Sequence, residues 1–240
     1  MENKTSKYFK YAIGEIVLVV IGILIALQIN NWNENNNLSK KEVALLTDLK
    51  NDVEGDITNL KRQDSLFAKS EIDAALGITL FYKATTAKEI DLVFTLTDGF
   101  WNELSIQRNT FNQMINSGSL YTMQNKNLQK QINKYYSSVE AHIEYIRGVN
   151  LMLSNLWEQN PDIYPAKFLI SQLKKPQVDL KKIDTTWIQN PKSATYLSVD
   201  NYINTTQNLN NIYRREVFRR LITSAEKLRV SIIDEIELRK

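Results

Sequence analysis

Hydrophobic residues form one unbroken run near the start of the chain. From Ile16 to Leu27 no side chain is charged or strongly polar, and the wider segment 12–29 contains 18 residues. A helix of that size is about 27 Å long at about 1.5 Å per residue, close to the ~30 Å hydrocarbon core of a bilayer. A core helix of a soluble domain normally keeps a polar stripe, and this run has none. The pattern therefore predicts a transmembrane helix at residues 12–30.

The flanks of this run favour an anchor that stays attached, with its N-terminus in the cytoplasm. Aromatic residues lie at both ends, as at the two interfaces of a membrane: Tyr8, Phe9 and Tyr11 before the run and Trp32 after it. Lysines precede the run at Lys4, Lys7 and Lys10, whereas the sequence NNWNENNN behind it has no cation. The positive-inside rule then makes residues 1–11 a cytoplasmic tail. A cleaved signal peptide is the main alternative, but LIALQINNWNE lacks a small-x-small cleavage site.

Beyond a polar linker at residues 31–38, helical periodicity continues through a domain predicted at residues 39–240. Ser39 and Glu42 have the spacing of a capping box, which predicts that a long helix begins there. Its apolar residues recur at steps of three, four and seven, as on one face of a helix: Val43, Leu46, Val53, Ile57, Leu60, Phe67, Ala74, Ile78 and Phe81.

Two further long helices are predicted from the same kind of pattern. The cleanest heptad, typical of a coiled coil, spans residues 125–159 through Leu128, Ile132, Tyr135, Val139, His142, Ile146, Val149, Leu153 and Leu156. The last helix is expected at residues 199–238. Its inward face would contain Ile203, Leu209, Ile212, Val217, Leu221, Leu228, Ile232 and Ile236.

Short helices are expected between the long ones. Thr86 and Glu89 form a second capping box and predict a helix that stops at the Asp-Gly pair at 98–99. Another helix is predicted at residues 104–117, with Gly118 as its C-cap because glycine adopts a positive φ at low cost.

A region without periodicity precedes the last helix. Residues 160–193 contain all four prolines and are expected to form either a lid or a loop, with one short helix near residues 166–173. No β pattern occurs anywhere in the sequence. The predicted fold class is therefore all-α, with a single transmembrane helix followed by an extracytoplasmic antiparallel bundle of long helices and short helices in the connections.

The composition argues against several classes of function. With 30 basic and 27 acidic residues, the net charge of +3 is too balanced for a nucleic-acid-binding protein. The chain has no cysteine, which excludes disulfides and thiolate metal sites. It contains no hydrolase, metalloprotease, phosphate-loop or calcium-loop motif. The lone His142 is interpreted as a core residue, and the carboxylates of NDVEGD at 51–56 as a solvated helix face. We expect no catalytic residue, metal or cofactor.

One candidate interaction surface lies within the predicted membrane span. Gly14, Gly22 and Ala26 are spaced by eight and four residues, which places them on one face of a helix. Such a small-residue face lets a second helix approach closely. Glu15 borders this face and has two interpretations: an interfacial carboxylate near the positive end of the helix, or an acid that pairs with a partner helix. The predicted partners are the lipid bilayer and another membrane protein or a second copy of the chain.

A second candidate surface is basic. Arg214, Arg215, Arg219 and Arg220 lie close together on the last helix, where guanidinium groups could bind an anion or an acidic partner. The alternative is an ordinary charged surface, because Glu216 and Glu226 lie nearby.

The run YAIGEIVLVVIGILIALQINNWNE resembles the N-terminal signature of an uncharacterised family of single-pass membrane proteins common in flavobacteria and related Bacteroidota. The stretch TFNQMINSGSLYTMQNKNLQKQINKYY resembles the central helix–turn–helix of that family more weakly. The resemblance implies a domain of unknown function in the cell envelope and supplies no catalytic residues.

These observations favour a non-enzymatic protein, anchored in the inner membrane with its C-terminal domain in the periplasm, that scaffolds or docks a partner. The alternative is an extracytoplasmic ligand-binding or sensory domain that signals through a separate membrane partner.

Overall fold

The computed structural model describes residues 3–97, 103–158 and 184–239. No strand occurs in these ranges, so the all-α fold class is confirmed. In chain order the elements are α1 (Asn3–Phe81), α2 (Ala87–Thr97), α3 (Asn109–Asn116), α4 (Ser119–Thr122), α5 (Lys126–Glu158), the 3₁₀ turn η2 (Thr186–Gln189), α7 (Ala194–Ile212), the π-helical η3 (Tyr213–Phe218) and α8 (Arg219–Leu238).

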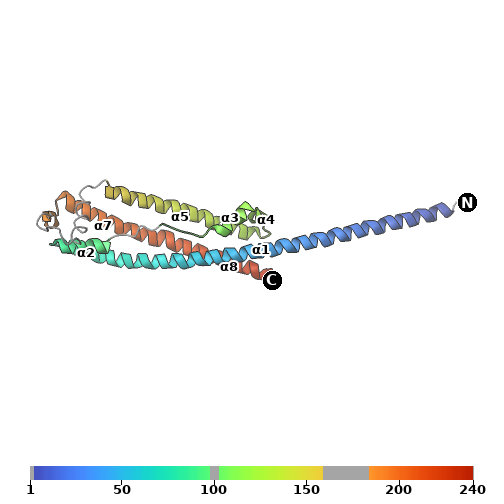
Figure 1. Ribbon diagram of the computed structural model, residues 1–240, viewed down its shortest axis with the longest axis horizontal. Coiled ribbons are helices and arrows are strands. Elements are labelled where there is room, and N and C mark those ends of the chain that lie inside the picture. Colours follow the sequence, from blue (N-terminus) through green and yellow to red (C-terminus); the bar gives the residue numbers. More distant parts are fainter. Residues whose placement is uncertain (1–2, 98–102, 159–183, 240) are drawn as a thin grey trace, which may run out of the picture.

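Helix α1 has 79 residues and extends far beyond one end of the bundle as a stalk (Figure 1). At about 1.5 Å per residue it is about 118 Å long. The predicted helix start at Ser39 is wrong, because Ser39 and the polar residues 31–38 lie inside this continuous helix. The physical reason is that neither glycine nor proline occurs between Gly22 and Gly55, so no residue in that stretch breaks the helix.

The long helices form a bundle in which α7, η3 and α8 run antiparallel to both α1 and α5. Along α1, Glu42 pairs with Arg239, Lys61 pairs with Glu226, and Tyr82 donates to Asp200. The start of α5 lies against the end of α8, because Asn125 bonds to Glu235. Helices α1 and α5 are therefore parallel to each other, and both point away from the stalk (Figure 1).

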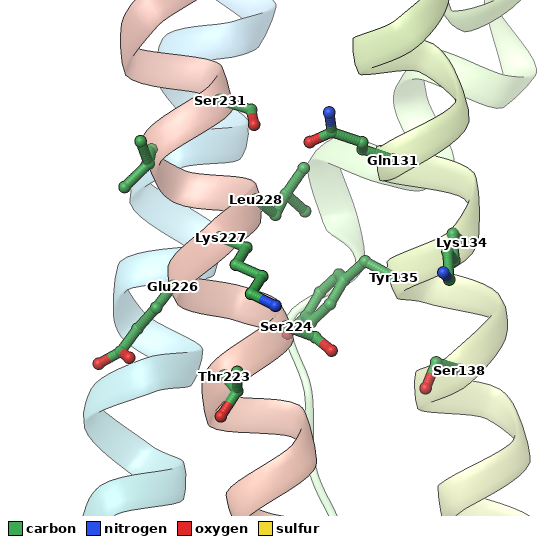
Figure 2. A pocket seen from close by; sticks show the side chains of 11 residues that line it. Gln131, Lys134, Tyr135, Ser138, Thr223, Ser224, Glu226, Lys227, Leu228 and Ser231 are labelled. Carbon is green, nitrogen blue, oxygen red and sulfur yellow. The ribbon is translucent and has the colours of Figure 1, made fainter.

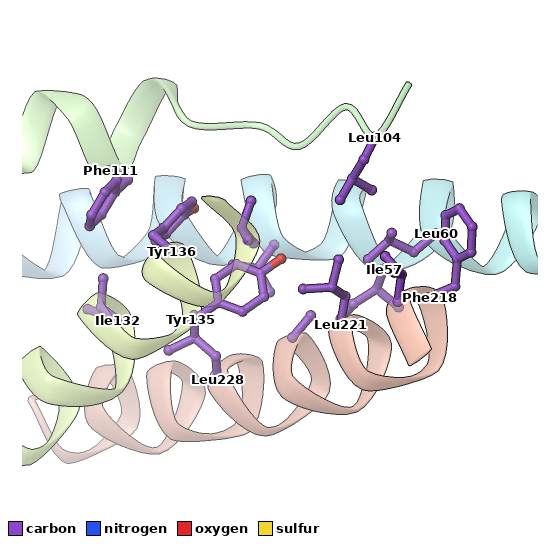
Figure 3. Packing of buried hydrophobic residues seen from close by; sticks show 14 of the residues in the cluster. Ile57, Leu60, Leu104, Phe111, Ile132, Tyr135, Tyr136, Phe218, Leu221 and Leu228 are labelled. Atoms are coloured by element: carbon purple, nitrogen blue, oxygen red, sulfur yellow. The ribbon is translucent and has the colours of Figure 1, made fainter. Parts of the chain in front are cut away.

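The main core lies between these three helices, and Figure 3 shows Ile57 and Leu60 of α1 facing Leu221 of α8. Phe67 is fully buried, stacks on Tyr213 at a centroid distance of 5.4 Å and contacts Phe218 at 5.3 Å. The predicted inward faces are confirmed in large part, since most of their residues are buried: Leu46, Val53, Ile57, Leu60, Phe67, Ala74 and Phe81 in α1; Leu128, Ile132, Tyr135, Val139, Ile146, Val149 and Leu153 in α5; Ile203, Leu209, Val217, Leu221, Leu228, Ile232 and Ile236 in α7 to α8.

An extended segment, residues 103–108, precedes α3 and packs Leu104 into the main core above α1 (Figure 3). The predicted helix at 104–117 is therefore too long, because the helix begins at Asn109. Its end is confirmed: Gly118 follows α3 with a φ of 73°, in the left-handed region that favours glycine.

A smaller core closes the end of the bundle farthest from the stalk. It joins the end of α1, α2, η2 and α7 around Phe81, Phe94 and Trp187. The predicted capping box of α2 is confirmed, because Glu89 accepts the Thr86 N–H at 2.9 Å and the Thr86 hydroxyl accepts the Glu89 N–H at 3.3 Å. The short helix predicted at 166–173 lies outside the described residues.

Candidate functional site

The apolar part of α1 is exposed wherever its side chains are described. Every residue from Gly14 to Asn35 is exposed, and Leu18 retains 70% of its accessible surface. This is the candidate membrane span in the described part of the chain, by length and composition. Apolar surface of this extent is unfavourable in water by about 25 cal/mol per Å², so it calls for a lipid or protein environment.

The predicted small-residue face lies on this exposed helix. A Cβ atom added to Gly14 or Gly22 would meet no atom within 4 Å in the described structure. Ala26 and Glu15 are exposed beside them. The four residues therefore form an accessible face, and no other described element of the chain covers it.

A polar cluster clamps the three long helices at the end of the bundle nearest the stalk. Arg239 donates to Glu235 of α8 at 2.5 Å and to Glu42 of α1 at 3.0 Å, and Asn125 at the start of α5 donates to Glu235 at 2.5 Å. Burial alone would raise the pKa of Glu235, but the bonds from Asn125 and Arg239 lower it overall. The clamp fixes the point at which α1 leaves the bundle.

The four arginines lie in different surroundings. Arg214 turns toward α1, where it pairs with Asp64 and Glu71, and Arg220 pairs with Glu216 on its own helix. Arg215 and Arg219 remain exposed. Arg214 and Arg215 belong to the π-helical turn η3, whose wider turn keeps Tyr213, Val217 and Phe218 buried. The arginines thus divide between bundle packing and solvent.

One carboxylate of the NDVEGD sequence is buried rather than solvated. Asp56 is 1% exposed, and its carboxylate accepts the Gln107 N–H at 2.8 Å and the Tyr135 hydroxyl at 3.4 Å. Asp52, one turn earlier, accepts the Thr110 N–H at 3.1 Å and so caps the start of α3 from α1. The solvated-face interpretation is therefore wrong for Asp56. These two carboxylates bind the backbone of the segment that enters α3.

Gly55 also belongs to this site, where burial raises the pKa of Asp56. A Cβ at Gly55 would come within 2.3 Å of the Gln107 side-chain nitrogen, so the glycine provides room for that side chain. Burial, with a contribution from the Asp52 charge, raises the pKa of Asp56 to about 7 against the opposing hydrogen bonds from Gln107 and Tyr135. The Asp56 carboxyl therefore titrates near neutral pH.

An open groove of about 790 Å³ lies between α5 and α8. Figure 2 shows its two walls, with Lys134 and Ser138 on α5 and Lys227, Ser224 and Ser231 on α8. Tyr135 and Leu228, each 2% exposed, form its floor. Neither the lysines nor the two α8 serines were singled out from the sequence, because only packing brings the two helices together.

The described residues contain no cluster of histidine and carboxylate side chains able to hold a metal ion. His142 is half-buried rather than part of the core, and its Nδ1 lies 2.6 Å from the Ser138 carbonyl oxygen one turn earlier. That carbonyl accepts a hydrogen bond from Nδ1–H, which leaves the lone histidine as a local helix contact.

Comparison with known families gives one partial match. Residues 15–73 match the model of a family of unknown function, DUF6090. All of these residues lie in α1, and they include both the exposed apolar run and the first part of the bundle. The predicted resemblance to an uncharacterised family is confirmed to that extent. Comparison with curated proteins and with solved structures gives no match.

Proposed function

We propose that the protein is a non-enzymatic, single-pass inner-membrane protein that docks a membrane partner through its N-terminal helix. The N-terminus is cytoplasmic and the bundle is periplasmic, as the lysines before the span favour. The observation that carries the proposal is the exposed small-residue face of Gly14, Gly22 and Ala26 on a helix that continues without a break into the bundle. The proposal also includes the resemblance of the N-terminal run to single-pass flavobacterial membrane proteins.

The continuity of α1 gives this docking a mechanical consequence. A helix that turns or tilts in the membrane carries the bundle with it, because Arg239 and Glu235 hold α1, α8 and the start of α5 together where the bundle begins. A partner helix on the small-residue face would therefore orient the whole periplasmic domain. This coupling suits a scaffold that presents a surface at a fixed angle to the membrane.

The docking proposal is tested with the full chain in native-lipid nanodiscs. Gly22→Leu adds a side chain on the small-residue face, whereas Val20→Leu places the same leucine about 200° around the helix and controls for its presence in the span. We expect cross-linking to capture one defined complex with the wild type and with Val20→Leu, and to lose it with Gly22→Leu. The same complex in all three chains, or monomers in all three, would contradict the proposal.

The second candidate function is ligand binding with signalling through a separate membrane partner, and the groove between α5 and α8 favours it. A volume of about 790 Å³ lies in the range of small-molecule sites. A thermal-shift screen of envelope metabolites against the full chain tests this candidate, and the absence of any shift counts against it.

A further inference from the structure

We propose that the groove between α5 and α8 binds a soluble oxyanion with at least two negative charges, such as a phosphate- or carboxylate-bearing molecule. The proposal names the ligand class for the second candidate function and is independent of docking through the membrane span. It starts from the charge of the groove. Lys134 and Lys227 come from opposite walls, and neither has an ion-pair partner among the described residues (Figure 2).

The acid that lines the groove does not neutralise these lysines. Glu226 lies on the side of α8 away from α5 in Figure 2 and pairs with Lys61 of α1 at 2.7 Å. That pairing lowers the pKa of Glu226 and keeps its charge directed toward α1. The groove therefore carries two exposed positive charges that no acid among the described residues pairs with, which favours an anion as its ligand.

The remaining lining supplies neutral donors for oxygen atoms. Ser224 and Ser231 make no hydrogen bond within the described structure, and Gln131 and Ser138 add an amide and a hydroxyl on the opposite wall. Ammonium and hydroxyl donors together match the several acceptor oxygens of a phosphate or carboxylate group. The floor is held in place, because the Tyr135 hydroxyl donates to Asp56. A fixed floor reduces the entropic cost of binding.

The position of the groove favours a ligand from the aqueous phase over a lipid headgroup. The Lys61–Glu226 pair places the groove beside residue 61 of α1. Because α1 is continuous, that level is about 48 Å beyond Ile29, at about 1.5 Å per residue. The headgroup region of each leaflet is only about 5–8 Å thick. A phospholipid in the membrane that holds the anchor therefore cannot reach the groove.

Inorganic pyrophosphate, titrated calorimetrically into the full chain in phosphatidylcholine nanodiscs, is the probe. We expect the Kd to rise at least tenfold in Lys134→Gln/Lys227→Gln. The charge-matched control is Lys69→Gln/Lys192→Gln, which removes two exposed lysines elsewhere. Its Kd should stay within twofold of the wild type. A Ser224→Ala/Ser231→Ala chain should weaken binding severalfold with all charges retained.

Three results would overturn the proposal. One is no binding of pyrophosphate at 10 mM. Another is an equal loss in both lysine double variants, which would reveal general charge attraction. The third comes from a second arm with phosphatidylglycerol vesicles: attachment that depends on Lys134 and Lys227 while pyrophosphate does not bind would assign the groove to a lipid headgroup. Loss of the cross-linked complex in Gly22→Leu concerns docking alone, so the two proposals fail separately.

Discussion

The two parts of α1 are built on the same helical backbone but present opposite surfaces. In residues 16–29 apolar side chains surround the helix and all are exposed. In residues 43–81 most of them lie on one face and are buried against α5, α7 and α8, while Ile72 and Leu76 are exposed. Trp32 is 69% exposed and Phe67 is fully buried, although both are large aromatic residues of one helix. The distribution of apolar residues around the helix therefore determines whether each part of α1 is exposed or packed in the bundle. The backbone between the two parts stays helical.

The largest effect should follow from removing an aromatic residue in the bundle part of α1. Phe67→Ala deletes the ring that stacks on Tyr213 and contacts Phe218. We expect the free energy of unfolding of the bundle to fall by about 3–5 kcal/mol, as for other buried aromatic truncations. Trp32→Ala is the control on the stalk and should leave urea unfolding in nanodiscs within about 0.5 kcal/mol of the wild type. Equal losses would mean that the two parts of α1 do not differ as described.

A pH effect of nearly the same size should come from Asp56, in the bundle part. Its pKa is raised from 3.8 to about 7, so between those values the folded chain holds a proton that the unfolded chain has lost. The contribution of Asp56 to the free energy of unfolding therefore decreases as pH rises from about 4 to 7, by about 4 kcal/mol in total, and is constant above pH 7. Asp56→Asn should abolish this decrease while keeping an acceptor for the Gln107 N–H.

The Asp56 prediction is checked by urea unfolding of both chains at pH 5 and pH 8. The wild type should lose stability relative to Asp56→Asn as pH rises. Parallel pH profiles would show that Asp56 ionises in the folded chain as easily as in the unfolded one.

The clamp between the two parts of α1 should have an intermediate effect. Arg239→Ala leaves the nearly buried carboxylates of Glu235 and Glu42 without their cation, which we expect to lower the free energy of unfolding by about 2–3 kcal/mol. Arg147→Ala breaks an ion pair with Glu144 whose partners are both more than half exposed, so its effect should be below about 0.5 kcal/mol. Thermal unfolding of the two variants side by side measures the difference, and a cost for Arg239→Ala as small as that for Arg147→Ala would contradict the clamp.

The smallest predicted effect is the difference in stability between substitutions at two sites with the same capping-box spacing, Thr86 and Ser39. Thr86→Ala removes the hydroxyl that accepts the Glu89 N–H and donates to the Glu89 carboxylate, so it should cost about 1 kcal/mol. Ser39→Ala changes a residue inside continuous α1, where alanine is the better helix former, and should be neutral or slightly stabilising. Denaturation of both variants decides the point, and a loss near 1 kcal/mol at Ser39 would indicate that a helix does begin there.

Patterns that depend on neighbouring residues in the sequence predicted much of this fold. The heptad from Leu128 to Leu153, the Thr86–Glu89 box and the positive φ at Gly118 follow from local spacing and backbone preference, and the structure has all three. The helix start predicted from the Ser39–Glu42 spacing was wrong, because a capping box permits a helix start without requiring one. Only the lack of glycine and proline around it indicates that the helix continues.

Features that depend on contacts between distant segments could not be predicted. Residues 104–108 have a helical pattern, but the Asp56 carboxylate accepts the Gln107 N–H of this segment without a helix there, and Asp52 accepts the Thr110 N–H where α3 begins. Gly55 was the one local signal, since a glycine in the middle of a helix often marks a close approach. The groove likewise exists only because α5 and α8 meet, so Lys134 and Lys227 lie more than 90 residues apart in the sequence.

The continuity of α1 is tested most directly by a distance measurement across residues 31–38. Because the chain has no cysteine, spin labels can be attached at Asn30→Cys and Asp48→Cys in the full chain in nanodiscs. These exposed positions are 18 residues apart, which is five helical turns, on the same face and about 27 Å along the axis. Pulsed electron spin resonance should give a single narrow distance distribution near that value. A broad distribution, or one centred at a much shorter distance, would show that residues 31–38 form a flexible connection and would contradict the account.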